Sequence, residues 1–510
     1  MSSTNATLAG SPAGAPPGVR PLATGPVAAV GALATSALAA VTASSRLPEI
    51  VAITAGLIAM GAVAGAWLII GRRSAGPRQL YAIAAAWGAP LLLAPPLFSG
   101  DVWSYLAQGA TAAAGLDPYR LGPAAALGAD SVFTQQVSHY WLDTPAPYGP
   151  AWMLLSRGVA LLTGEHLTVG VLVYRLIAVS GLALIAWALP RLAARAGVAP
   201  STALWLGLLN PLVLWHLLGG VHNDALMLGL MLAGLELALA GVGRLGVERS
   251  IGVLAAGVTL LTLAATIKFV AGAAFCVVVI ALMHRPGRPV RPLVAVVAGA
   301  IAGTAALSAA AGFGWMSSPL GALSVYSWMS PTTATGMLIG ALAGGDATPL
   351  AVRVANAAGL LVCVPVVAAL LVAMARHRVA PIRGLGLIFT VALLCGAVVQ
   401  PWYVLWAVLP LAASAGTARA RHLIAAVSVA FAFAVPPLVG NAPAMIAGYV
   451  IATAVLGAAA LVVHRRAVRR APVAGQDVVI PVPRRSGVVV SRRPFGGLSV
   501  HTEAEAFPRR

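Results

Sequence analysis

The sequence predicts an all-α protein that crosses a membrane many times. Apolar residues make up 60% of the 510 positions and charged residues only 9%, whereas soluble domains carry roughly 25% charged residues. Long apolar runs recur along the chain, and a membrane-spanning helix needs about 20 such residues. Arginines concentrate in alternate connecting segments, a pattern that fixes helix orientation. We therefore expect about 14 spanning helices, or up to 16.

Ten apolar runs have the length of a single spanning helix. They cover residues 24–44, 50–71, 79–98, 167–190, 200–219, 225–242, 291–311, 349–375, 422–439 and 444–464. Two further stretches, 251–284 and 384–416, are too long for one helix. We expect the first to break near Lys268 and the second at residues 400–402, where the sequence reads Gln-Pro-Trp.

Two shorter apolar segments, residues 150–164 and 332–344, fall inside long loops. Each is too short to span a bilayer as a straight helix. We expect both to be interfacial or re-entrant helices. If both cross the membrane instead, the number of spanning helices becomes 16.

The distribution of basic residues predicts the orientation. The segments on the side of the two termini carry 17 basic residues, and the opposite loops carry four. The positive-inside rule then places residues 1–23 and 465–510 in the cytoplasm as disordered tails, the second one basic. The membrane domain is residues 24–464, and its first large loop, 99–166, lies outside. The net charge of +19 forms no stripe with interleaved aromatic residues, so we expect no nucleic-acid partner.

Asp101 follows directly after an apolar run, in the sequence Ser-Gly-Asp-Val-Trp. Its carboxylate is expected at the membrane interface, where a lipid headgroup would lie. A carboxylate in that place can accept the proton of an attacking hydroxyl group, as a general base does. The alternative is that Asp101 only caps the amphipathic segment 102–115.

Prolines and aromatic residues mark the rest of this outer loop. The sequence runs Asp117-Pro-Tyr119 and later Tyr148-Gly-Pro-Ala-Trp152. Prolines fix the backbone, and aromatic faces offer surfaces on which sugar rings stack. The alternative is turn chemistry combined with an interfacial aromatic belt.

Further polar residues interrupt apolar runs on the same side. His222, Asn223 and Asp224 open one helix, and such residues in a membrane are costly unless paired or functional; an N-cap role for Asp224 is the alternative. Lys268, the only lysine, can extend its ammonium toward a lipid phosphate. Arg175 and Arg353 are further candidates for phosphate binding, because a guanidinium matches phosphate oxygens bidentately. Interfacial anchoring is the alternative for all three basic residues.

The residues Gln400, Trp402 and Tyr403 mark another break on the outer side. Unrelated structural irregularities would divide between the two faces of the membrane. Their convergence on one face therefore indicates one shared site.

The motifs, in this order, resemble the actinobacterial polyprenol-phosphomannose-dependent α-1,6-mannosyltransferases of lipomannan and lipoarabinomannan synthesis. The likeness extends from about residue 79 to residue 464. The matching segments are GDVWSYLAQG (100–109), GLDPY (115–119), TPAPYGPAW (144–152), NPL (210–212), HND (222–224) and QPWY (400–403).

The resemblance implies a GT-C glycosyltransferase fold with a large first outer loop. It implies transfer of mannose from polyprenyl-phosphate-mannose to a lipid-anchored α-1,6-mannan acceptor on the outer face of the plasma membrane, with inversion. Asp101 becomes the expected catalytic base. The expected donor-binding residues are Lys268, Arg175, Arg353, His222, Asn223 and Asp224. The expected acceptor-binding or sugar-binding residues are Tyr105, Asp117, Tyr119, Tyr148, Trp152, Gln400, Trp402 and Tyr403.

Many GT-C enzymes carry an adjacent acidic pair in the first outer loop, whereas this chain has Gly100, Asp101 and Val102. We therefore expect no metal and no other cofactor. The alternatives are a transferase for another polyprenyl-phosphate sugar, or a multispan transporter or flippase. Transporters usually show internal repeats with sites near the midplane, and the sequence shows no such repeat.

Overall fold

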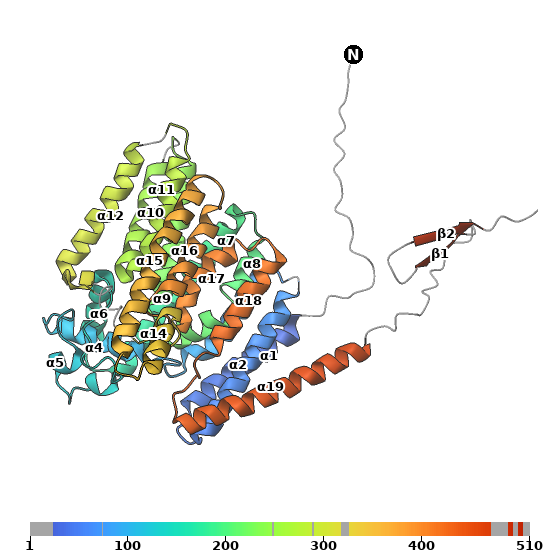
Figure 1. Ribbon diagram of the computed structural model, residues 1–510, viewed down its shortest axis with the longest axis horizontal. Helices are drawn as coiled ribbons and strands as arrows, with labels where there is room; N and C mark the ends of the chain where they lie inside the picture. The colour runs from blue at the N-terminus through green and yellow to red at the C-terminus, as the bar shows by residue number, and fades with distance from the viewer. Residues whose placement is uncertain are drawn as a thin grey trace, which may run out of the picture. The chain divides into compact units, whose positions relative to one another are not determined.

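The computed structural model describes residues 24–73, 75–246, 249–287, 290–317, 326–470, 488–492 and 498–502. The predicted amino-terminal tail, residues 1–23, lies outside these ranges. The chain divides into two compact units, Met1–Ala452 and Thr453–Arg510. In the first unit the described regular structure is helical (Figure 1).

The elements up to the centre of the chain are Thr24–Ala43 (α1), Glu49–Gly71 (α2), Pro77–Gly88 (α3), Ala89–Leu92 (η1), Asp101–Ala113 (α4), Pro123–Leu127 (α5), Thr134–Gln136 (η2), Pro150–Thr163 (α6), Leu167–Arg195 (α7), Pro200–Leu206 (α8), Val213–Gly219 (η3), Asp224–Gly243 (α9) and Ser250–Ile267 (α10). The helices of the remaining chain are Phe269–Gly272 (η4), Ala273–Met283 (α11), Val290–Ala311 (α12), Gly314–Ser317 (η5), Pro331–Leu342 (α14), Thr348–Ala375 (α15), Pro381–Cys395 (α16), Pro401–Tyr403 (η7), Val404–Ala413 (α17), Ala418–Ala432 (α18) and Ala442–Arg470 (α19). The strands Val488–Arg492 (β1) and Leu498–Thr502 (β2) pair antiparallel.

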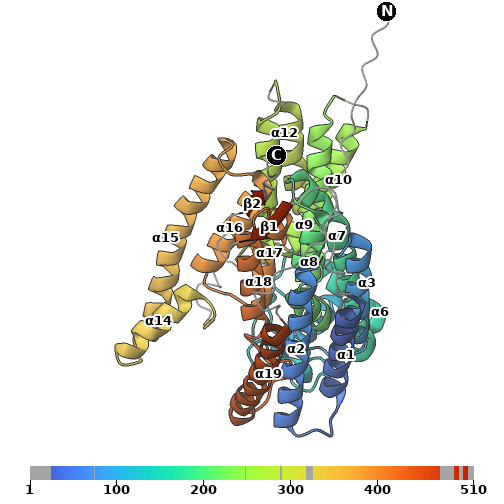
Figure 2. The same cartoon turned by 90° about the vertical axis from the view of Figure 1, so that its right-hand side faces the viewer.

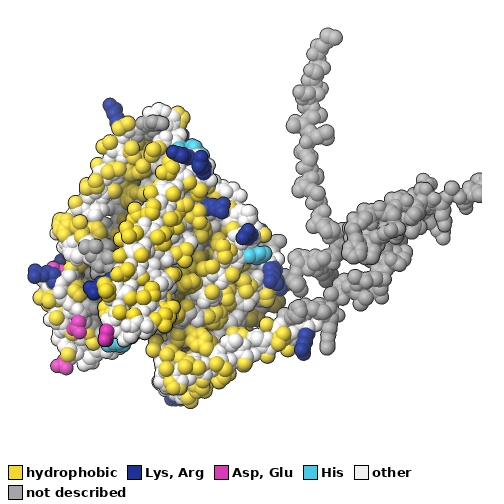
Figure 3. Space-filling view, viewed as in Figure 1, with side chains coloured by type: hydrophobic (Ala, Val, Ile, Leu, Met, Phe, Trp, Pro, Cys, Tyr) yellow, Lys and Arg dark blue, Asp and Glu magenta, His cyan; other side chains and the backbone are white. Residues whose placement is uncertain are grey.

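Among the described residues, eight helices are long and apolar enough to cross a membrane: α1, α2, α7, α9, α10, α12, α15 and α19. Shorter apolar helices lie at Phe269–Met283, Pro381–Cys395 and Pro401–Ala413. Hydrophobic side chains cover most of the face in Figure 3. The predicted class, an all-α polytopic membrane protein, is confirmed, and the total of about 14 spans stays a prediction.

Both predicted breaks of the long apolar stretches are confirmed. α10 ends at Ile267, and Lys268 has extended backbone angles before η4 begins at Phe269. α16 ends at Cys395, and the helix resumes only at Pro401. Both predicted short segments are also helical, as α6 and α14. Figure 2 shows α14 beside α15 at one edge of the helical unit.

Two predicted spans are interrupted. The run 79–98 is helical only to Leu92, in α3 and η1, because Pro95 and Pro96 cannot donate the next helical hydrogen bonds. The run 200–219 divides into α8 and the π-helical turn η3, because Pro211 interrupts the ladder. The predicted domain boundary at residue 464 falls inside α19, and the domain boundaries stay a prediction.

α9 is the most enclosed of the long helices, and it packs between α7 and α10. Glycines allow the close approach that membrane helices use for packing. A Cβ atom at Gly181 of α7 would clash with the Ala225 carbonyl, and one at Gly257 of α10 would clash with the Ala238 nitrogen. The position of α9 matters because its first residue, Asp224, belongs to the site described below.

We expect Gly257→Ala to lower the unfolding temperature in detergent, because overpacking against backbone costs about 1–3 kcal/mol. The matched control is Gly252→Ala on the same helix, where an added Cβ meets nothing within 4 Å. Thermal unfolding of the two purified variants measures the difference. Equal unfolding temperatures would contradict tight α9–α10 packing at Gly257.

Candidate active site

Asp101 is the first residue of α4, where the helix dipole favours a negative charge. The N-cap of α4 is Gly100, which has no side chain, and Ser99 Oγ accepts a hydrogen bond from the Asp101 backbone nitrogen at 3.1 Å. Asp101 Oδ1 accepts a hydrogen bond from Ser99 Oγ at 2.9 Å, and Oδ2 lies 3.4 Å from His222 Nδ1. The carboxylate is thus directed toward His222 and away from a capping role.

The surroundings of Asp101 keep its carboxylate ionised. Burial raises the pKa of Asp101, but His222, the hydrogen bond from Ser99 and the charge of Lys268 together outweigh burial and lower the pKa below its ordinary value. A general base must be deprotonated at the working pH. Asp101 meets this requirement at neutral pH.

An aromatic wall stands behind the imidazole of His222. The Trp402 ring stacks on it with centroids 3.7 Å apart and an interplanar angle of 22°. Trp402 belongs to η7, the turn that begins at Pro401. The helix break between α16 and α17 therefore positions this ring. His216 of η3 lies behind both rings, 5.5 Å from Trp402 and 6.0 Å from His222 between centroids.

Lys268 and Asp224 form an ion pair across the ends of two helices. Lys268 Nζ donates to Asp224 Oδ2 at 2.5 Å, and Trp406 Nε1 donates to Oδ1 at 2.7 Å. Asp224 is fully buried, whereas the Lys268 side chain is 13% exposed. The ammonium also lies 4.8 Å from the centroid of the Tyr403 ring. The carboxylate therefore orients the ammonium, and no N-cap bond uses Asp224.

Several buried polar atoms beside Asp101 have no hydrogen-bond partner among the described residues. They are His222 Nε2, whose ring faces Asp101 through Nδ1, both ring nitrogens of His216, both amide atoms of Asn223, and the indole nitrogen of Trp402. Buried polar groups in proteins are nearly always satisfied. These atoms are therefore available to a bound polar molecule such as a phosphate or a sugar.

The backbone is strained just before both Asp101 and His222. Phe98 and Val221 have positive φ angles of 65° and 55°, which are outliers for bulky and β-branched residues. Phe98 lies three positions before Asp101, and Val221 directly precedes His222. Hydrogen bonds from Leu97 N to Gly219 O and from Phe98 N to Pro437 O hold this backbone. Such strain clusters at functional sites.

Comparison with known proteins identifies the family. Residues 18–284 match the family described as "Alpha-(1->6)-mannopyranosyltransferase, N-terminal domain", and residues 329–465 match "MptB C-terminal domain". The chain belongs to the α-(1→6)-mannopyranosyltransferase family. The enzyme is 42% identical over 381 residues to a probable α-(1→6)-mannopyranosyltransferase of Mycolicibacterium smegmatis, with 68% of each chain covered.

Further mannosyltransferases show similar relations. An α-(1→6)-mannopyranosyltransferase of Mycobacterium tuberculosis is 41% identical over 377 residues, with 64% of each chain covered. A second one from that organism, α-(1→6)-mannopyranosyltransferase A, is 38% identical over 387 residues, with 72% of each chain covered. No solved structure gives a significant match to this chain. A membrane-embedded mannosyltransferase is therefore established as the class of this enzyme.

Three predicted sugar-binding residues of this mannosyltransferase, Tyr105, Tyr148 and Trp152, form an aromatic cluster next to Asn223. Tyr105 Oη accepts a hydrogen bond from the Asn223 backbone nitrogen at 3.4 Å. The Tyr105 ring lies 5.3 Å from that of Tyr148 and 5.0 Å from that of Trp152 between centroids. Burial, followed by neighbouring ionisable groups that include Asp101, raises the pKa of Tyr105 and of Tyr148. Both phenols therefore stay protonated and can donate hydrogen bonds.

Asp117 and Tyr119 lie in a separate cluster. Asp117 Oδ1 accepts from the Tyr119 backbone nitrogen at 2.9 Å, closing a turn. The Tyr119 ring packs with Ala146 and Met153, outside the main core. Among the described residues no contact joins either side chain to Asp101.

The contacts of the two predicted phosphate-binding arginines and of Gln400 are with backbone groups. Arg175 Nη1 donates to the Leu92 and Ala94 carbonyls at 2.8 and 2.7 Å, so this guanidinium fastens the segment that leads to Asp101. Arg353 is exposed on α15, and its Nε donates to Pro349 O. Gln400 precedes η7, and its backbone carbonyl accepts from Tyr403 N.

Sequence reasoning missed three residues of the site: Ser99, His216 and Trp406. Ser99 and Trp406 bond the two carboxylates directly. The sequence offered a signal for two of them: Ser99 carries a hydroxyl two positions before Asp101, and Trp406 carries an indole one helical turn after the Gln-Pro-Trp break. His216 had no signal in its apolar run. Among the described residues no three His, Cys, Asp or Glu side chains gather in a metal-binding group, and metal independence stays a prediction.

We expect Lys268→Ala to destabilise the mannosyltransferase, because it leaves the buried Asp224 charge without its cation, a change that costs about 3–5 kcal/mol. The double variant Lys268→Met with Asp224→Asn removes both charges and should recover most of the unfolding temperature. Thermal unfolding in detergent measures both variants. A wild-type unfolding temperature for Lys268→Ala alone would show that the ion pair contributes little.

Proposed function

We propose that the enzyme transfers mannose from polyprenyl-phosphate-mannose to a lipid-anchored α-1,6-mannan acceptor, with Asp101 as the base. The observation that carries the proposal is the Asp101 carboxylate, whose pKa its neighbours lower, beside buried polar atoms of His222, Asn223 and Trp402 that have no hydrogen-bond partner among the described residues. The names of the relatives support mannose as the sugar and α-(1→6) as the linkage. Another polyprenyl-phosphate sugar is the alternative donor.

The proposed reaction is a single displacement. An acceptor hydroxyl gives its proton to Asp101 while its oxygen bonds to the anomeric carbon. The bond from that carbon to the phosphate oxygen breaks, and polyprenyl phosphate leaves with the electron pair. The proton then passes from Asp101 to water. One carboxylate acting as base, without a covalent intermediate, inverts the anomeric centre.

The proposed donor phosphate lies at the Lys268 ammonium. Asp224 Oδ2 accepts one hydrogen bond from Nζ, and an ammonium has three donors. The partly exposed ammonium keeps donors for the phosphate oxygens, where charge accumulates as the leaving group departs. His222 and Asn223 supply additional donors near Asp101. This arrangement gives the donor a charged end beside the base.

We place this site on the outer face of the plasma membrane. The support is the count of basic residues, 17 against four between the two sides of the predicted topology. In Figure 3 the acidic side chains gather at the lower left, and several basic side chains lie along the upper right edge, with others at the left and at the bottom. The site residues Asp101, His222, Lys268 and Trp402 all fall on the predicted outer side.

The first test is the substitution Asp101→Asn, which keeps the size of the side chain and removes the base. We expect transfer from radiolabelled polyprenyl phosphomannose to a short α-1,6-mannoside to fall by about 10²- to 10⁴-fold. Asp130→Asn, an exposed change in the same loop, is the matched control and should keep wild-type turnover. Near-wild-type turnover of correctly inserted Asp101→Asn protein would exclude Asp101 as the base.

The second test is the pH profile of kcat/KM. Because the pKa of Asp101 is lowered, the base stays ionised, and activity should persist, down to a pH below the ordinary aspartate pKa of about 3.9. His222→Ala removes lowering contributions and leaves burial, which raises the pKa, so the acid limb should move to higher pH. His139→Ala, an exposed histidine of the same loop, should leave the limb in place. An unchanged limb in His222→Ala would contradict the pairing.

A further inference from the structure

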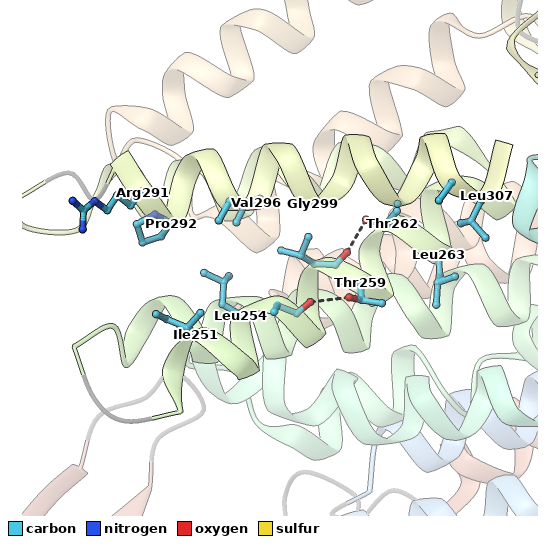
Figure 4. Close-up of a pocket in the computed structure, with 15 residues that line it drawn as sticks. Ile251, Leu254, Thr259, Thr262, Leu263, Arg291, Pro292, Val296, Gly299 and Leu307 are labelled. Atoms are coloured by element: carbon cyan, nitrogen blue, oxygen red, sulfur yellow. Dashed lines mark hydrogen bonds between the residues drawn. The ribbon is translucent and has the colours of Figure 1, made fainter. Parts of the chain in front are cut away.

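A long groove lies between α10 and α12, and it shares no lining residue with the Asp101 site. Its cavity volume is about 560 Å³, within the range of roughly 300–1,000 Å³ typical of ligand sites. Figure 4 shows Arg291 and Pro292 at one end and Leu307 at the other. Small residues of α12, among them Gly299 and Gly303, line the groove.

The wall of the groove offers almost no free polar group. Its two threonine hydroxyls are bonded within α10: Thr259 donates to Ala255 O at 3.0 Å and Thr262 to Val258 O at 2.9 Å. The remaining lining between the ends is aliphatic. Such a wall suits a hydrocarbon chain and disfavours a sugar or a peptide backbone, whose polar groups would stay unsatisfied.

The length of the groove matches one leaflet or more. From Arg291 to Leu307 the α12 axis covers about 24 Å at a helical rise of about 1.5 Å per residue. The hydrocarbon core of a bilayer is about 30 Å thick, so one leaflet supplies about 15 Å. A lipid chain of about 15 Å that enters beside Arg291 therefore fits entirely within the groove.

The charge of Arg291 decides which kind of lipid fits. Arg291 is exposed at the mouth of the groove, and among the described residues its guanidinium has no ion-pair or hydrogen-bond partner. It lies on the side that the arginine distribution predicts to be cytoplasmic. A guanidinium binds phosphate oxygens in bidentate geometry.

We propose that the groove binds an anionic phospholipid of the leaflet at the Arg291 end. One acyl chain lies between α10 and α12, and the phosphate contacts Arg291. The occupant fastens α12, whose long apolar window is only 11% buried within the protein. The far end of α12 leads to Gly312 and Gly314, which pack on the Tyr119 ring, so the lipid supports that outer cluster from within the membrane.

The polyprenyl chain of the donor fits this groove less well. The only lysine, Lys268, follows α10 but is turned toward Asp224 of α9. On α10, Gly257 packs against α9, whereas Val258 and Thr259 line the groove. The side of α10 that faces α9 is therefore not the side that lines the groove. The single cation of the groove lining stands at the opposite end from Lys268. A phosphate at Lys268 would therefore leave Arg291 unmatched.

The experiment exchanges the purified full-length protein into bilayers with equal amounts of phosphatidylglycerol and phosphatidylcholine of the same chains. Native mass spectrometry then counts the lipid retained after extraction. We expect the wild type to prefer phosphatidylglycerol by about fivefold, the factor for one arginine near an anionic headgroup. Arg291→Gln should lose the preference, and Thr259→Phe, which fills the groove, should lose the retained lipid.

Two matched controls should behave as wild type. Arg383→Gln removes another exposed arginine on the same predicted side, and Thr259→Val keeps the groove open. The proposal is overturned if phosphatidylcholine is retained equally, if either test variant keeps wild-type retention, or if added polyprenyl phosphate displaces the phosphatidylglycerol. The last result would assign the groove to the donor chain. Because the readout is lipid retention, it is independent of mannosyl transfer.

Discussion

The rest of the structure depends on the pairing of buried charges, because an unpaired ion inside a membrane protein has a large unfavourable free energy. The helix α9 carries two such pairs. At one end of α9, the buried Asp224 pairs with Lys268 at the break after α10. Farther along, Glu236 pairs with Arg195 of α7, with Arg195 Nε 2.6 Å from Glu236 Oε2. Uncompensated buried ions are strongly unfavourable. The two pairs therefore fasten α9 to α10 near one end and to α7 along its length.

The site depends on the same arrangement. Because α9 begins at Asp224, the residues immediately before it, His222 and Asn223, are held beside α4 and Asp101. The break near residue 400 supplies Trp402 to stack on His222 and, one helical turn later, Trp406 to bond Asp224. Three interruptions of helices, near residues 100, 222 and 400, thus meet at one place. Interrupted backbone at membrane depth is tolerated where it lines such a site.

Much of this organisation was predictable from the sequence, because each interruption leaves a local mark. Lys268 within an apolar run and proline at residue 401 predicted both breaks correctly. The partners of these residues were not predictable. Asp224 and Lys268 were each noted, yet 44 positions separate them. Only the packing of the helices brings the two side chains into contact. The contact of Lys268 with a lipid phosphate stays a prediction, and the sequence did not show that Asp224 orients this ammonium. Arg175 likewise bonds backbone carbonyls exposed where prolines end a helix early, an acceptor that residue patterns do not reveal.

The proposed site holds the donor phosphate at Lys268 and the reacting sugar at Asp101. The most direct measurement is a structure of the enzyme bound to an unreactive polyprenyl-phosphate-mannose analogue. We expect a phosphate oxygen within about 3 Å of Lys268 Nζ, a hydrogen-bond distance, and the anomeric carbon facing Asp101. A phosphate bound at Arg353 or on the opposite side of the membrane, with Asp101 remote from the sugar, would contradict it.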